Sequence, residues 1–197
     1  TGRANMKIKD NLYQKRFKRY NINNQAHELT FSCYHRKPYL RDTQACDYLA
    51  EAIVMAQQKY SLDLWAYVFM PDHVHLLIWP RQEGYSISSI LQTIKQSVSR
   101  RMLPHLKAEA ANAETPFHFW QAGGGYDRNV TCRDTARQII KYIHLNPVRK
   151  KLVQLPHEWN YSSYKDWMGL GCGPIAIQKE GFTGCAARGD APRPSGA

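Results

Sequence analysis

The sequence LWAYVFMPDHVHLLIWP, residues 64–80, determines how the rest of the chain can be placed. It predicts two short apolar strands, about 63–70 and 73–79, joined by a tight turn at Met70-Pro71-Asp72. Because the connection is short, these strands should pair as an antiparallel hairpin. The remaining predicted elements can then be placed relative to this hairpin.

Two histidines begin the second strand of the hairpin, with one valine between them. Side chains on a strand alternate between its two faces, so His73 and His75 should point to the same side. Val74 should point to the opposite side, together with Leu76 and Ile78. Two imidazoles on one face of a rigid strand form half of a divalent metal site. A further ligand from elsewhere in the chain would complete it.

The rest of the chain is expected to complete one α+β domain. Its 197 residues, with 43% hydrophobic content, are enough to form one core. Two further strands are expected, over 28–34 and over 126–130. Three helices are expected as well. The first begins after a cap at Asp42 or Thr43 and ends near Lys59, the second covers about 88–102 and is ended by Pro104, and the third covers about 134–146 and is stopped by Pro147. Residues 105–117 should form a surface connection, and a loose tail should begin at Gly169.

The chain is strongly basic, with 27 Lys and Arg against 16 Asp and Glu and a formal net charge of +11. This excess favours a polyanionic partner, most commonly nucleic acid, and the 12 tyrosines and 5 tryptophans offer surfaces on which bases can stack. The expected DNA contacts are Lys15, Arg16, Lys18 and Arg19 in an N-terminal arm, and Arg149, Lys150 and Lys151 after the last predicted helix. The arm is equally compatible with a solvated basic tail.

Five cysteines without a CxxC motif predict neither a disulfide framework nor a zinc ribbon. No apolar run approaches the roughly 20 residues that span a bilayer, and the N-terminal residues show no signal-peptide core. We therefore expect a cytoplasmic protein in a reducing compartment, without a membrane partner.

The last predicted helix carries a second group of polar residues. Tyr142 and Asn146 are four positions apart and share one face with Gln138, because helix positions that differ by four lie above one another. An oxygen of the Asn146 side chain is a candidate third ligand beside His73 and His75. Imidazole together with a hard oxygen donor suits Mg²⁺ or Mn²⁺. Packing of this helix against the strand would bring the Tyr142 hydroxyl near the metal.

A tyrosine beside such a metal indicates transesterification of a phosphodiester. A free phenol is a weak nucleophile near neutral pH because it is protonated. A metal polarises the scissile phosphate and stabilises the charge that develops on its oxygens. Attack by Tyr142 would give a covalent phosphotyrosine that conserves the bond energy and permits strand transfer as well as cutting. A metal-bound water would give simple hydrolysis instead.

Each of these features also has an ordinary structural interpretation when it is taken alone. A His-x-His pair on a strand is often unrelated to metal, Asn146 before Pro147 can cap the helix, and Tyr142 can be a half-buried packing residue. Together, in this order and in a basic chain, the features favour metal-dependent chemistry on DNA.

Two runs of residues resemble signatures of a known family. Residues 68–77, VFMPDHVHLL, resemble the signature of the single-tyrosine HUH transposases, and residues 142–149, YIHLNPVR, resemble that of their REP-associated tyrosine transposase branch. Residues 119–121 (FWQ) and 159–163 (WNYSS) are similar to weaker blocks of the same branch. The resemblance follows the family's order. It departs from the family at the AGGG run after Gln121, where similar proteins often carry a basic and a bulky residue.

The resemblance implies a ferredoxin-like (RRM-like) antiparallel sheet with helices on one face and the tyrosine helix beside the His pair. It implies an HUH active site in which His73, His75 and Asn146 hold the metal and Tyr142 is the nucleophile. His144 is typical of the family and is not expected to be a ligand. Members of the family cut single-stranded DNA near hairpins, leaving a 5′-phosphotyrosine and a free 3′-hydroxyl.

These observations divide the chain into a basic arm (1–25), an HUH catalytic domain (26–168) and a flexible Gly/Pro-rich tail (169–197). The favoured function is a metal-dependent single-stranded DNA endonuclease and strand transferase. One alternative is a hairpin-binding protein on the same fold that is catalytically weak or inactive. Another is a nuclease that uses water, in which Tyr142 only positions DNA. The sequence leaves undecided whether the protein is a monomer or a homodimer.

Overall fold

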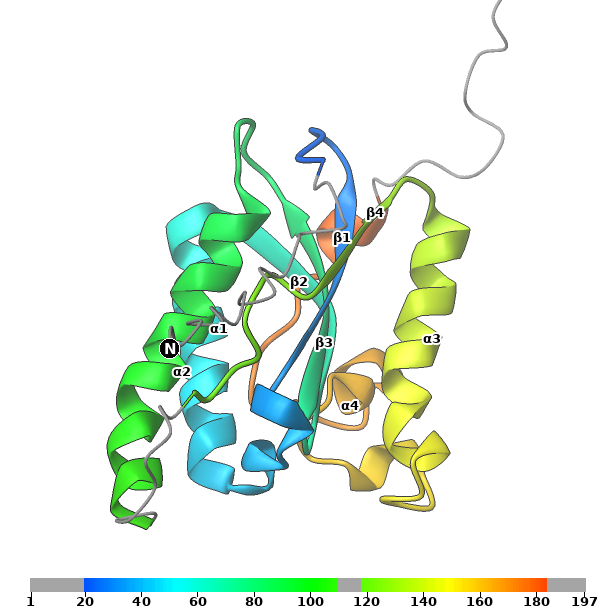
Figure 1. The fold of residues 1–197 in the computed structure, drawn as a ribbon. Coiled ribbons are helices and arrows are strands. Elements are labelled where there is room, and N and C mark those ends of the chain that lie inside the picture. Colours follow the sequence, from blue (N-terminus) through cyan, green and yellow to red (C-terminus); the bar gives the residue numbers. More distant parts are fainter. Residues whose placement is uncertain (1–19, 110–117, 184–197) are drawn as a thin grey trace, which may run out of the picture.

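The computed structural model of the protein describes residues 20–109 and 118–183 (Figure 1). Its strands are β1 (Ala26–Ser32), β2 (Leu62–Met70), β3 (His73–Pro80) and β4 (Tyr126–Val130). Its longer helices are α1 (Thr43–Tyr60), α2 (Ile87–Glu109) and α3 (Arg133–Arg149). The short helices are η1 (Tyr34–Arg36), η2 (Tyr39–Arg41), η3 (Pro156–Glu158), α4 (Tyr164–Met168) and α5 (Glu180–Thr183). Within the described ranges, no helix has both the length and the apolar character needed to cross a membrane.

The strands form an antiparallel sheet in the order β2-β3-β1-β4. β3 is an interior strand, and its pairing places His73 opposite Met70 on β2 and His75 opposite Thr30 on β1. With α1 between β1 and β2, and α2 between β3 and β4, the order is that of a ferredoxin-like α+β fold. The predicted fold class is confirmed. The first strand begins two residues earlier than expected, at Ala26, and the chain leaves it for η1 after Cys33.

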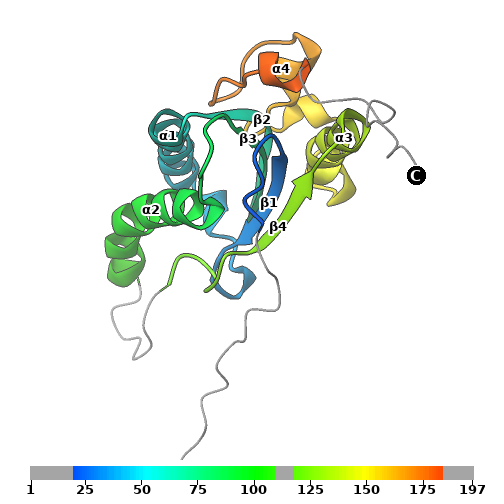
Figure 2. The same cartoon turned by 90° about the horizontal axis from the view of Figure 1, so that it is seen from above.

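Helices cover both faces of the sheet, as Figures 1 and 2 show. α1 and α2 pack on one face, over a core that includes Leu29, Leu49 and Ile94. α3 packs on the other face, where Ile143 joins a second core with Leu77 of β3. α3 thus lies beside the His pair, on the face opposite the other two long helices. The reason is that α3 follows the edge strand β4 and returns across the face that α1 and α2 leave open.

The alternation predicted for β3 is present in the structure. Val74, Leu76 and Ile78 belong to the core beneath α1 and α2. His73 and His75 lie on the opposite side of the strand, which faces α3, and both are buried. All nine positions of the neighbouring strand β2 are buried as well. The two histidines are therefore fixed to an interior strand with strands on both sides.

Two predicted helix ends are wrong, and both involve a proline. α2 continues past Pro104 into the predicted surface connection, and α3 continues past Pro147 to Arg149. Proline removes one N–H donor and crowds the preceding turn, but close to a helix end this affects few hydrogen bonds. At the end of α3 the Lys150 N–H still donates to the carbonyl of Asn146 over 3.0 Å. Both helices therefore extend beyond the positions that the prolines suggested.

The segment after α4 differs from the loose tail that its Gly and Pro content suggested. Ile175 and Phe182 are buried, and the N–H of Ile175 donates to the Tyr67 hydroxyl over 3.2 Å. The side-chain oxygen of Gln178 accepts from the N–H of Leu64 over 3.0 Å. Two apolar side chains and a few edge contacts are thus enough to hold this segment against β2. Residues 184–197 lie outside the described part of the chain.

Gly125, just before β4, fits its place only because it lacks a side chain. Its φ is +70°, and an added Cβ would lie 2.1 Å from the carbonyl oxygen of Thr30. We expect Gly125→Ala to lower the free energy of unfolding by about 2–4 kcal/mol, measured by urea denaturation. Gly84→Ala is the matched control, because Gly84 has a similar φ of +68° but open space around it. Equal losses in the two variants would contradict the steric argument.

Candidate active site

A cavity of about 470 Å³ opens between β3 and α3. The four residues predicted for the reaction centre, His73, His75, Tyr142 and Asn146, all line it. Thr30, Arg36, Asp72 and Lys150 also line this cavity, which we call the catalytic cavity. The structure therefore brings together residues that lie far apart in the sequence, from β3 and from α3. Their individual roles stay predictions, and the geometry below shows what each side chain is able to do.

His75 is held in one orientation by the neighbouring strand. Its Nδ1 is 2.8 Å from the hydroxyl of Thr30, directly opposite on β1. Its Nε2 is buried and has no hydrogen-bond partner among the described residues. Burial lowers the pKa of His75 to about 4, and the neighbouring His73 adds to this effect. The ring is therefore neutral near pH 7, which is the form that binds a metal.

His73 is oriented by an acidic side chain in the preceding turn. Its Nδ1 lies 2.6 Å from Oδ1 of Asp72, whose second oxygen accepts from Arg36 over 3.1 Å. Burial lowers the pKa of His73, although the hydrogen bond to Asp72 works in the opposite direction. The rings of His73 and His75 lie edge to face with centroids 4.8 Å apart. In each ring the Nδ1 is occupied, so Nε2 is the atom left for a ligand.

Tyr142 and Asn146 come from consecutive turns of α3. The Tyr142 side chain is 40% exposed, and its ring centroid lies 5.6 Å from that of His75. The guanidinium of Arg149 lies over the same tyrosine ring at 5.5 Å. Asn146 is buried, and its amide nitrogen donates to the carbonyl of Tyr142 over 3.4 Å. The amide oxygen is therefore the ligand atom that this residue could offer, while the tyrosine hydroxyl remains accessible to a substrate.

The side chains of this cavity fit a divalent metal ion. A buried imidazole nitrogen without a partner is costly unless it meets a ligand, and His75 Nε2 is such an atom within the described residues. The orienting bonds from Thr30 and Asp72 are of the kind that fixes metal-bound imidazoles in proteins. Among the residues that the structure describes, no cluster of three or more His, Cys, Asp or Glu could hold a metal. The Asn146 amide oxygen, which also lines the cavity, stays the predicted third ligand.

Comparison with known proteins identifies the family. The family described as "Transposase IS200 like" matches residues 9–146 of the chain, a span that contains both histidines of β3 and Tyr142. The chain belongs to the IS200-like transposase family. The predicted family is thus confirmed, and a transposase-like fold for binding DNA follows from it. No match was found among curated proteins.

A solved structure shows the same fold as this chain. It is described as a REP-associated tyrosine transposase bound to a REP hairpin. It superposes with a TM-score of 0.63 at 24% sequence identity, over 83% of this chain and 91% of the other. A candidate transposase from Deinococcus radiodurans R1 is 26% identical, with a TM-score of 0.43, over 64% of this chain and 95% of the other. The first of these comparisons supports the fold alone.

The weaker signature block WNYSS, residues 159–163, contacts both α3 and β2. His144 is buried, and its Nε2 lies 2.9 Å from the hydroxyl of Ser163. The same hydroxyl accepts from the N–H of Tyr67 on β2 over 3.0 Å. The indole N–H of Trp159 donates to the carbonyl of Phe69 over 2.9 Å. His144 thus links α3 to β2 through the 159–163 segment and is not among the residues that line the catalytic cavity.

Only part of the predicted DNA-binding set can be placed. Lys150 lines the catalytic cavity, and Arg149 lies beside Tyr142. Lys151, the next residue after Lys150, is exposed. The other four predicted contacts, Lys15, Arg16, Lys18 and Arg19, lie outside the described residues.

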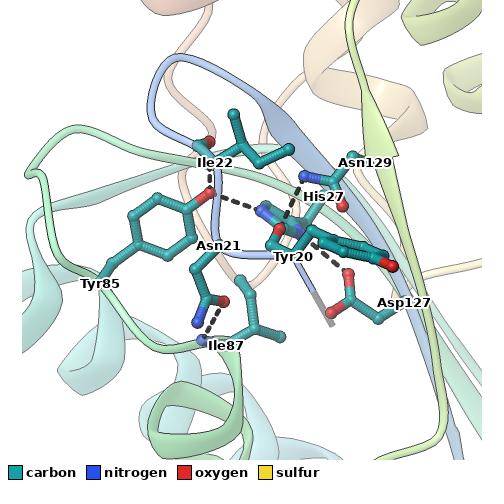
Figure 3. Close-up of polar contacts among 8 residues, drawn as sticks. All are labelled: Tyr20, Asn21, Ile22, His27, Tyr85, Ile87, Asp127 and Asn129. Carbon is teal, nitrogen blue, oxygen red and sulfur yellow. Dashed lines mark hydrogen bonds and ion pairs between the residues drawn. The ribbon is translucent and has the colours of Figure 1, made fainter. Parts of the chain in front are cut away.

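The described chain begins with residues that are firmly attached to the sheet (Figure 3). The carbonyl of Tyr20 accepts from the Asn129 side chain over 2.8 Å, and the carbonyl of Ile22 accepts from the Tyr85 hydroxyl over 2.7 Å. That hydroxyl also lies 2.7 Å from Nε2 of His27, which is completely buried and bonded to Asp127 through Nδ1 over 2.8 Å. These contacts fix the point where the basic arm joins the fold.

Sequence reasoning missed three polar residues of the catalytic cavity. Thr30 orients His75, Asp72 orients His73, and Arg36 contacts Asp72. Asp72 directly precedes the His pair, so its role could have been inferred from the motif. Thr30 required the pairing of β1 with β3, which the sequence does not give. Arg36 lies in η1 with a φ of +56°, next to His35 at +49°, and no sequence pattern predicted this unusual backbone.

Proposed function

We propose that this transposase is a metal-dependent endonuclease and strand transferase that acts on single-stranded DNA near hairpins, as a member of the REP-associated branch. One observation carries the proposal: Tyr142, the His73–His75 pair and Asn146 line the same cavity. A nucleophile, two imidazole ligands and an amide ligand in one cavity are the components that metal-assisted phosphoryl transfer requires. The hairpin substrate is proposed from the solved relative, whose description records a bound REP hairpin.

In the proposed reaction the hydroxyl oxygen of Tyr142 attacks the phosphorus of one phosphodiester. A bond from the tyrosine oxygen to phosphorus forms while the bond from phosphorus to the 3′ oxygen breaks. The phenol proton passes to solvent, and the released oxygen takes up a proton to become a 3′-hydroxyl. The product is a 5′-phosphotyrosine. Attack on its phosphorus by another 3′-hydroxyl breaks the bond to the tyrosine oxygen, restores a phosphodiester and gives strand transfer. The attacking hydroxyl loses its proton and Tyr142 takes one up.

The remaining residues position the phosphate and stabilise charge. His73, His75 and Asn146 would hold a divalent cation, Mg²⁺ or Mn²⁺, which would stabilise the charge that develops on the phosphate oxygens. The Asp72 carboxylate and the Thr30 hydroxyl keep the two imidazoles in a fixed orientation. Lys150, on the wall of the same cavity, offers a cation to the DNA backbone.

A denaturing gel with end-labelled single-stranded hairpin DNA tests the proposal. Hairpins drawn from repeats near the protein's own gene would be incubated with the protein in Mg²⁺, Mn²⁺ or EDTA. We expect a covalent protein–DNA adduct together with a free labelled strand, in both metals and not in EDTA. Cutting without an adduct would instead indicate hydrolysis by water. Binding with neither product would indicate a hairpin-binding protein that lacks catalysis.

The basic cluster at the end of α3 should contribute salt-dependent affinity for DNA. We expect Lys150→Ala combined with Lys151→Ala to flatten the plot of log affinity against log salt by about 0.7 for each phosphate that these lysines neutralise. Fluorescence anisotropy with labelled single-stranded DNA at several salt concentrations measures this slope. Lys59→Ala combined with Arg100→Ala is the matched control, since it removes the same charge from exposed positions on α1 and α2. Equal slopes for the two double variants would rule out a local contact.

A further inference from the structure

A second hollow, of about 500 Å³, lies directly beside the catalytic cavity. The two share Thr30, His75 and Tyr142 as lining residues, so the second hollow begins where the proposed chemistry takes place. Its other walls come from β1, from β4 and from the first half of α3. Figure 2 shows α3 beside β4, the edge strand that pairs with β1. A strand of DNA with its phosphate at Tyr142 would have its next nucleotide within reach of this hollow.

A carboxylate in the second hollow distinguishes it from a phosphate-binding groove. Glu28 of β1 is buried and lies opposite Arg128 of β4 in the sheet register. One oxygen of Glu28 is 2.8 Å from a terminal nitrogen of Arg128. Burial raises the pKa of Glu28, while Arg128 acts in the opposite direction. A carboxylate repels a phosphate but accepts hydrogen bonds from base N–H groups, so this hollow suits the edge of a nucleobase.

The second hollow also offers aromatic surface for stacking. Tyr126 is two residues before Arg128 on β4, so both side chains point to the same face, and its side chain is 43% exposed. Tyr142 forms part of the wall on the other side, together with Ile139 of α3. Nucleobases stack on such rings in many proteins that bind single-stranded DNA. The hollow therefore combines a polar pair that can read a base with aromatic rings on which the base can lie.

Among the four bases, guanine matches the polar pair best. Its Watson–Crick edge presents two adjacent donors, N1–H and the N2 amino group, which one carboxylate can accept together. The neighbouring O6 accepts from arginine. Adenine and cytosine place an acceptor beside their single amino group, and thymine places its one N–H between two carbonyls.

We propose that the second hollow binds a guanine next to the scissile phosphate, with Glu28 and Arg128 forming hydrogen bonds to its Watson–Crick edge. This proposal rests on the proposed function, because the neighbouring phosphate is the one that Tyr142 would attack.

The test measures base preference without any cleavage. Fluorescein-labelled single strands of sequence TTTTXTTTT, with X as guanine, inosine, adenine, cytosine or thymine, are bound to the full chain in EDTA, and affinity is read by anisotropy. We expect the guanine strand to bind about tenfold more tightly than the thymine strand, as one good bidentate contact implies. Inosine, which lacks the N2 amino group, should lose most of that advantage.

Substitution of the carboxylate identifies the residue responsible. Glu28→Gln should reduce the guanine preference to less than about twofold. Asp134→Asn, which removes the same charge at an exposed position on α3, should leave it unchanged. Guanine and thymine strands that bind the wild-type protein with equal affinity would overturn the proposal. So would a preference that survives Glu28→Gln. The inosine comparison needs no variant and stays decisive if Glu28→Gln fails to fold.

The result separates this proposal from the proposed function. If all bases bind equally while the protein still forms a covalent adduct with hairpin DNA, the base pocket is refuted and the enzyme remains. If guanine is preferred but no adduct forms under any metal condition, the pocket remains and the enzyme proposal fails.

Discussion

Replacing Tyr142 by phenylalanine should abolish the covalent adduct with hairpin DNA, a loss of at least about 1,000-fold in adduct yield per unit time. The substitution removes only the hydroxyl oxygen that is proposed to attack phosphorus. Phenylalanine keeps the ring that lies edge to face on His75 and beneath the guanidinium of Arg149. Affinity for the hairpin should therefore change by less than about threefold. The adduct is measured on a denaturing gel, and affinity by anisotropy under the same conditions.

The matched control for this variant is Tyr48→Phe. Tyr48 lies on α1, on the other face of the sheet, where Arg101 stacks on its ring at 3.4 Å. It loses the same hydroxyl group far from the catalytic cavity, so its adduct yield should equal that of the wild type. An adduct that persists in Tyr142→Phe would mean that another residue is the nucleophile. If Tyr142→Phe cut DNA at the normal rate without an adduct, the reaction would be hydrolysis.

Replacing His75 by alanine should have the second largest effect, through the metal. The Nε2 of His75 is a buried nitrogen that has no partner among the described residues, so its loss removes a candidate metal ligand. The variant also loses the bond between His75 Nδ1 and the Thr30 hydroxyl. We expect the affinity for Mn²⁺ to fall by at least about 100-fold, together with the metal-dependent adduct. Isothermal titration calorimetry measures the affinity. Because a bound ion stabilises the folded state, Mn²⁺ should raise the melting temperature of the wild type but not of His75→Ala.

A subtler variant tests the orientation of the same ring. Thr30→Val keeps the shape of the side chain but removes the hydroxyl that lies 2.8 Å from His75 Nδ1. We expect the Mn²⁺ affinity to fall by about 10–100-fold, as is common when an orienting bond to a metal ligand is removed.

For His75→Ala, the control for the loss of a histidine is His105→Ala, at an exposed position on α2. Unchanged metal affinity in His75→Ala would show that the metal binds elsewhere or not at all.

The centre of the fold could be predicted because its signals are local. The hairpin of β2 and β3 follows from two apolar runs with a very short connection, and the common face of His73 and His75 follows from the period of two. The shared face of Tyr142 and Asn146 follows from the helical period in the same way. The meeting of the two groups in one cavity depended on the family resemblance, because no local pattern determines which face of the sheet a helix covers.

The features that were missed depend on contacts between distant segments. Thr30 meets His75 only because β1 pairs with β3, and Glu28 meets Arg128 only because β1 also pairs with β4. The docking of the segment around Ile175 depends on the Tyr67 hydroxyl, 108 residues earlier in the chain. The prolines in α2 and α3 were interpreted as helix ends, although both helices continue beyond them. Composition and spacing carry no information about such partners.

The most direct test of the central claim is to identify the residue that carries the DNA. The adduct formed with a short hairpin in Mn²⁺ is digested with nuclease and trypsin and analysed by mass spectrometry. Trypsin cuts after Lys141 and after Arg149, so Tyr142 lies in the peptide YIHLNPVR, which contains no other tyrosine. We predict that this peptide carries a nucleotide joined through a 5′ phosphate. A modified peptide that contains a different tyrosine, or hairpin cut in full with this peptide unmodified, would contradict the claim.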